Sequence, residues 1–145
     1  MLYTTDTDVL RLINAFETCI LPCAEWTHAA HFTVGLWYAL NNTPSEALRA
    51  MRTGINRYNP HCGAPTVNDI PRERGYHETL TVFYLDAIYR FCAENGVSKP
   101  LHELANILCE SEYAAKEFPL RFYSKEVLFS PDARYGYVPP DKAVL

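Results

Sequence analysis

Apolar residues recur at intervals of three and four along most of the chain, which is the spacing of one face of an α-helix. Near the amino terminus, Val9, Leu10, Ile13 and Phe16 follow this spacing and predict a helix over residues 6–18. Strand-like alternation of apolar and polar residues is absent over any useful length. The same spacing predicts further helices over residues 27–40, 44–58, 76–95 and 99–109, the first of which starts at either Glu25 or Thr27.

Helix boundaries are marked by residues that satisfy or interrupt backbone hydrogen bonds. Thr43-Pro44-Ser45-Glu46 combines a capping box with proline at the first helical position, so a helix should begin there. Gly96 is a suitable stop for the long fourth helix, on which Asp86 and Arg90 are spaced to form an ion pair. Shorter helices are expected over residues 112–118 and 120–128.

Two stretches lack helical spacing. Residues 59–75 contain Pro60, Gly63, Pro65 and Pro71, all of which favour turns. Loops of this length in small domains are often functional. The tail over residues 130–145 is also rich in proline, and we expect it to cover the surface without regular structure.

A chain of 145 residues suits one domain, and 48% hydrophobic with 21% charged residues is an ordinary globular balance. We therefore expect an all-α fold: a single domain over residues 1–145, built as a compact array of about five to six helices with an irregular C-terminal tail.

Charge and hydropathy exclude two classes of partner. The formal net charge of −4 argues against a nucleic-acid binder, which needs a basic face. No window approaches the roughly 20 apolar residues of a membrane span, and no secretory signal is visible. The five cysteines are scattered without a C-x-x-C motif, so reduced thiols in a cytoplasmic protein are expected. The oligomeric state is not predicted.

Two short segments carry three of the five histidines and are otherwise rich in apolar or small residues. Residues 25–31 contain His28 and His31, and residues 75–79 contain His77. Each segment lies near the start of a predicted helix. Histidines in such places are hydrogen-bonded, bound to a metal, or used in proton transfer. Which of these three roles they play determines the function of the protein.

His28 and His31 share a helix face because they are three residues apart, so their rings can converge on one ion. On a helix of roughly 3.6 residues per turn, the side chains of Glu25 and His31 point about 120° apart. Glu25 can therefore bind the same ion as the two histidines only if it lies just before the helix begins. Gly35 lies one turn beyond His31 and allows another backbone to come close.

His77 and Glu78 fall in the first turn of the fourth helix, where the helix dipole favours a neutral imidazole. A neutral imidazole is the form that binds a metal. His28, His31 and His77 therefore form a candidate three-histidine site for one zinc, iron, nickel or manganese ion. Glu78 or Glu25 would be the fourth ligand or the base.

Other interpretations of the histidines stay open. They are equally consistent with hydrogen-bonded, partly buried core residues, or with a metal-free ligand pocket. The metalloprotease motif H-E-x-x-H is absent, only half of the di-iron pattern occurs, and no C-x-x-C-H heme motif is present. Nucleophile elbows and glycine-rich phosphate loops are missing as well.

Several polar side chains elsewhere in the chain are candidates for substrate binding. Arg57 and Arg134 would orient an acidic group, since a guanidinium can bind a carboxylate in a bidentate manner. The remaining candidates are Tyr58, Tyr76, Thr81 and Tyr123.

These motifs together resemble a family of small bacterial all-α proteins without an established activity. The resemblance rests on residues 26–32 (WTHAAHF), 54–59 (GINRYN), 75–81 (GYHETLT) and the segment from Tyr123-Ser124 to Ala133-Arg134. It implies that the first two histidines, the Tyr-His-Glu-Thr block and the C-terminal arginine form one unit, and it carries no known cofactor or catalytic residue.

Two functions follow from these residues. In the first, the histidine and glutamate pocket holds one divalent metal and catalyses hydrolase- or lyase-type chemistry on a small molecule, with Glu78 or Glu25 as the base and Arg134 orienting the substrate. In the second, the protein is a non-catalytic helical ligand-binding or interaction module whose histidines are structural. Both need the second and fourth helices to pack side by side.

Overall fold

Threonine residues cap the starts of three long helices, and two of these caps are capping boxes. A computed structural model describes residues 1–145. Thr5 and Asp8 form a capping box at the start of the first helix, and Thr43 and Glu46 form the predicted box at the third. The α-helices are α1 (Asp6–Glu17), α2 (His28–Asn41), α3 (Pro44–Tyr58), α4 (Glu78–Asn95), α5 (Leu101–Glu110), α6 (Lys125–Leu128) and α7 (Pro131–Tyr135).

Short 3-10 helices occupy several of the connections, and no strand is present. They are η1 (Cys23–Glu25), η2 (Asn59–Cys62), η3 (Glu112–Ala114) and η4 (Phe118–Arg121). The all-α fold is therefore confirmed, and each of the five longer helices lies where the apolar spacing predicts it.

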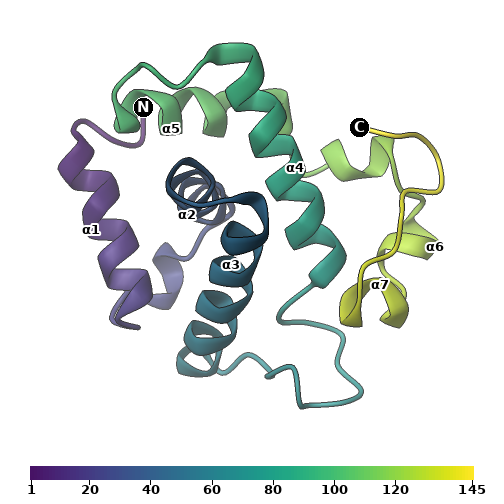
Figure 1. Ribbon diagram of the computed structural model, residues 1–145. Coiled ribbons are helices and arrows are strands. Elements are labelled where there is room, and N and C mark those ends of the chain that lie inside the picture. The colour runs from purple at the N-terminus through teal and green to yellow at the C-terminus, as the bar shows by residue number, and fades with distance from the viewer.

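Helix α2 lies at the centre of the fold, and Figure 1 shows it almost end-on between its neighbours. It packs against α1, α3, α4 and α5. Eight of its residues are buried, which explains why its sequence is apolar nearly all round. Because α2 touches four other helices, most of its length is enclosed, whereas His28 and His31 at its amino-terminal end are half-buried.

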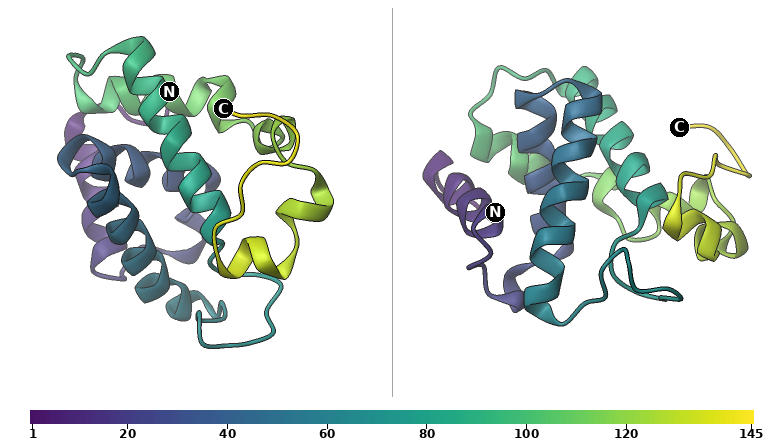
Figure 2. Two further views of the ribbon diagram at one scale, coloured as in Figure 1. Left: turned by 45° about the vertical axis from the view of Figure 1, so that its right-hand side comes forward. Right: turned by 60° about the horizontal axis from the view of Figure 1, so that its bottom comes forward.

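Helices α2 and α4 pack side by side, as the histidine site requires. Gly35 permits this approach, since a Cβ atom there would lie only 2.8 Å from Cδ1 of Ile88 on α4. Figure 2 shows α3 and α4 running down the same side of the molecule, with the loop of residues 59–77 crossing below them. The three helices and this loop thus surround a common space.

The C-terminal third departs from the expected pattern. The segment predicted as a helix over residues 112–118 contains only the 3-10 turn η3, and the irregular tail includes one helical segment, α7. The Ser130 hydroxyl accepts from the Ala133 backbone N–H at 3.2 Å, and Pro131 takes the first helical position. A local start signal therefore creates α7 without an apolar repeat.

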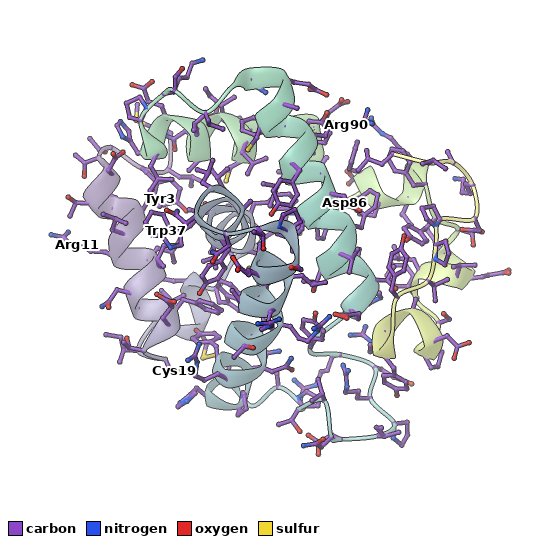
Figure 3. The ribbon with its side chains drawn as sticks, in the orientation of Figure 1. Tyr3, Arg11, Cys19, Trp37, Asp86 and Arg90 are labelled. Carbon is purple, nitrogen blue, oxygen red and sulfur yellow. A yellow bond between two sulfur atoms is a disulfide. The ribbon has the colours of Figure 1, made fainter.

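Helix α4 carries Asp86 and Arg90 on an exposed part of its surface, where Figure 3 labels both side chains. The predicted ion pair between them is not formed, since neither residue takes part in any of the salt bridges of the structure. Exposed pairs of this kind contribute little to stability, so solvation of the two charges is an adequate alternative.

A disulfide joins Cys23 to Cys62, with the two Cα atoms 5.7 Å apart. The prediction of five reduced thiols is therefore wrong for this pair, whereas Cys19, Cys92 and Cys109 are free. Sequence spacing could not reveal the bond, because its partners are 39 residues apart and meet only when η1 and η2 pack together.

Disulfides persist in oxidising compartments. The cytoplasmic location, which drew on reduced thiols, stays a prediction.

None of the helices combines the length and the apolar character that crossing a bilayer requires.

Candidate ligand-binding site

A cavity of about 420 Å³ lies between α2, α3, α4 and the loop that connects α3 to α4. No aspartate, glutamate, lysine or arginine lines it. Its wall is formed by Trp26, His28, His31, Phe32, Gly35, Met51, Ile55, Asn59, Ala64, Gly75, Tyr76, His77, Leu80, Thr81, Tyr84, Leu85 and Ile88. The structure thus brings both histidine segments to one place, as the histidine hypothesis requires.

His31 is held in one orientation by two contacts. Its Nδ1 donates to the Thr27 backbone carbonyl at 2.7 Å, and its ring stacks on Trp26 with the centroids 3.8 Å apart. Burial, opposed in part by the Thr27 carbonyl, lowers the pKa of His31 to about 4. The ring is therefore neutral at physiological pH, with a proton on Nδ1 and a lone pair on Nε2.

His28 contacts aromatic rings rather than polar groups. Its ring meets the edges or faces of Phe32 and Tyr84, with centroids 5.0 and 5.6 Å away. Its Nε2 atom is buried and has no hydrogen-bond partner. Burial is the main cause that lowers the pKa of His28, so this ring is neutral too. A buried polar atom without a partner is unusual enough to need an explanation.

His77 plays a different part, because both of its nitrogens are engaged. It is the N-cap of α4: Nδ1 accepts from the Leu80 backbone N–H at 3.0 Å. Nε2 donates to the Leu128 carbonyl at 2.8 Å, which ties α4 to α6. The ring is only 8% exposed, and burial is the first cause that lowers its pKa. His77 thus fixes the cavity wall and offers it no free nitrogen.

Glu78 is not directed into the cavity. Arg52 donates to both of its carboxylate oxygens, at 3.1 and 2.6 Å, and the Tyr76 hydroxyl donates to one of them at 2.5 Å. Burial alone would raise the pKa of Glu78, but these hydrogen bonds outweigh it and the net pKa is lowered. A saturated carboxylate of low pKa is a weak base, so its geometry favours a structural role.

The other predicted residues divide into two groups. Tyr76 and Thr81 line the cavity. Glu25 and Arg57 are exposed and lie outside it. Three more do not line the cavity and donate to backbone carbonyls: Tyr58 to Leu21 at 2.7 Å, Tyr123 to Val138 at 2.6 Å, and Arg134 to Gly75 of the cavity wall at 3.1 Å.

The apolar wall supplied by α3 is a part of the site that motif reasoning missed. Met51 and Ile55 lie four residues apart and so present one face of α3 to the cavity. That spacing was readable from the sequence, but nothing marked it as different from an ordinary core face. Asn59, the C-cap of α3, continues the same spacing and is 8% exposed.

No group of three or more His, Cys, Asp or Glu side chains is arranged to hold a metal ion. His77 would have to release either Leu80 or Leu128 to become a ligand. Metal binding by His28, His31 and His77 therefore stays a prediction that this geometry does not favour.

Comparison of the chain with models of protein families, with curated proteins and with solved structures finds no match. The resemblance to a bacterial family stays a prediction, and the function must be argued from the site alone.

The buried histidines predict a loss of stability at acid pH. The folded-state pKa of His31, about 4, is below the unfolded value of 6.5, so between these values only the unfolded chain binds the proton. Stability therefore falls as the pH drops below 6.5, by roughly 2 kcal/mol at pH 5 from His31 alone. Urea unfolding at pH 7 and pH 5 measures this loss.

His31→Phe is the matched variant for this pH measurement, because it keeps a ring beside Trp26 and cannot take up a proton. It should lose less stability than the wild type between the two pH values. His61→Gln removes an exposed histidine outside the cavity and serves as the control. Equal pH dependence in the wild type and His31→Phe would contradict the buried, neutral state of His31.

Proposed function

We propose that the protein binds one small, uncharged and largely apolar molecule in the cavity between α2, α3 and α4. The observation that carries this proposal is the composition of the wall: 17 residues, ten of them hydrophobic, with no charged side chain. A volume of about 420 Å³ lies within the roughly 300–1,000 Å³ of small-molecule sites. A few polar groups among many apolar ones are typical of such sites.

Binding without proton transfer is the better fit to the charges around the cavity. A histidine with a pKa of about 4 is a poor general base near neutral pH, where the most effective bases have pKa values close to 7. The carboxylate of Glu78 is paired with Arg52, and Glu25 is exposed and does not line the cavity. The non-catalytic hypothesis is therefore favoured over hydrolase or lyase chemistry.

Thr81→Phe tests the proposal by filling the cavity from α4. Its partner variant, Val82→Phe, adds the same ring at the next position, which does not line the cavity. Isothermal titration with 2-naphthol and with indole should show saturable binding of one molecule per chain. We expect affinity to fall at least tenfold in Thr81→Phe and to change little in Val82→Phe. Equal binding by both variants, or none by the wild type, would contradict the proposal.

A second candidate is a metal-dependent hydrolase or lyase, favoured by the two neutral imidazoles whose Nε2 atoms have no protein partner. His28 and His31 would supply two ligands, and a bound substrate or water would complete the coordination of a zinc, iron, nickel or manganese ion. Elemental analysis of untagged protein purified without chelator tests this candidate. About one metal per chain is expected, and metal-free protein that gains no thermal stability with any of the four ions would contradict it.

A further inference from the structure

We infer that the ligand of the cavity is a hydrogen-bond donor: an uncharged ring compound whose hydroxyl or N–H group donates to Nε2 of His31. This inference rests on the proposed function, which it narrows from apolar molecules in general to those that carry a donor. It follows from the tautomer that the protein imposes on His31.

The tautomer of His31 is fixed by its own helix. The Thr27 backbone carbonyl can only accept, so the 2.7 Å contact requires a proton on Nδ1 of His31. Stacking on Trp26 prevents the ring from turning freely, and Trp26 is itself stacked on Phe16 at a centroid distance of 4.4 Å. Nε2 of His31 therefore presents a lone pair that no protein group uses.

His28 adds a second unpaired nitrogen to the same cavity, since its Nε2 atom is buried and has no hydrogen-bond partner. This Nε2 accepts when the ring proton is on Nδ1 and donates when the proton is on Nε2, so either tautomer leaves it available to a ligand. Lys116 is a cation that disfavours a second proton, so it helps to keep the ring neutral.

No protein group is hydrogen-bonded to Nε2 of His31 or to Nε2 of His28. His28 and His31 are three residues apart on α2 and line one cavity, so a single molecule can reach both. The Thr81 hydroxyl is already committed as donor to the His77 carbonyl at 2.8 Å. An unmet acceptor in a buried site costs binding energy unless the ligand brings a donor.

The lining also limits the charge of the ligand. A free ammonium or carboxylate would enter a space without any counter-charge, and removal of such a group from water is expensive. Four aromatic side chains face the cavity and suit a flat ring: Trp26, Phe32, Tyr76 and Tyr84. The fitting class is therefore a phenol, an indole or a related neutral heterocycle.

Indole and benzofuran test the inference, because they share size and shape and differ mainly in the N–H donor that benzofuran lacks. Isothermal titration of the full chain at pH 7 should give at least tenfold tighter binding of indole. That ratio corresponds to about 1.4 kcal/mol, the size of one hydrogen bond in a buried site. The same comparison in His31→Phe, which keeps a ring and removes the acceptor, should bring the two affinities together.

His31→Leu also removes the acceptor, and this second variant keeps the test decisive if His31→Phe does not fold. His61→Phe alters a histidine outside the cavity and should retain the preference for indole. Equal binding of indole and benzofuran by the wild type would overturn the inference and leave the proposed function standing. Failure of both compounds to bind would overturn the two together.

Discussion

Reduction of the Cys23–Cys62 disulfide should lower the free energy of unfolding by about 2–4 kcal/mol. The bond closes a loop between residues 39 positions apart, and a loop of this length restricts the unfolded chain strongly. It also joins η1 to η2, the segments that lead directly into Trp26 and Ala64 of the cavity wall. Urea unfolding with and without a dithiol reductant measures the effect.

Cys23→Ser with Cys62→Ser should reproduce the stability of the reduced wild type and should no longer respond to reductant. Cys92→Ser removes a free thiol on α4 and serves as the control that keeps the response. A double variant as stable as the oxidised wild type would show that the disulfide contributes nothing to the fold.

The long helices were predictable because their signals are local. The spacing of apolar residues predicts α1 to α5, and the Thr43 capping box predicts the first residue of α3. Such signals need only neighbours within one or two turns, so a single sequence contains them. The helical segment α7 has a comparable local start at Ser130-Pro131. It was missed because too few residues follow to form an apolar repeat.

The candidate site was predictable only as separate segments. The sequence singles out the two histidine segments but does not show that they meet. The structure brings His28, His31 and His77 to one cavity, since both segments begin helices that pack side by side. The sequence could not assign the role of each ring. That role depends on which carbonyl or N–H group lies opposite, and Leu128 is 51 residues from His77.

Arg52 shows why the predicted base is not free. Its guanidinium donates to both carboxylate oxygens of Glu78, which lies 26 residues further along the chain. The spacing of residues along one helix cannot reveal a contact of this kind. Cys62 and Cys23 show the same limit, because their meeting depends on two irregular segments. Contacts between distant segments decide the chemistry of this site, whereas local pattern decides only its helices.

His77→Ala should destabilise the protein by about 2–4 kcal/mol, because one small side chain replaces two buried hydrogen bonds. Loss of an N-cap costs about 1 kcal/mol, and the Leu128 carbonyl left without a partner adds about 1–3 kcal/mol. The metal hypothesis predicts the opposite behaviour: loss of metal uptake with little loss of folding. Urea unfolding of the wild type and the variant, with elemental analysis of both, compares the two directly.

His77→Asn separates the two hydrogen bonds. Asparagine is among the best N-cap residues, so its side chain should accept from the Leu80 N–H and recover about 1 kcal/mol relative to alanine. It is too short to replace the bond to Leu128, which should leave the remaining deficit unchanged. An alanine variant that melts like the wild type would contradict the structural role. Because His77 anchors the wall that Tyr76 and Thr81 share, loss of this anchor should also weaken binding in the cavity.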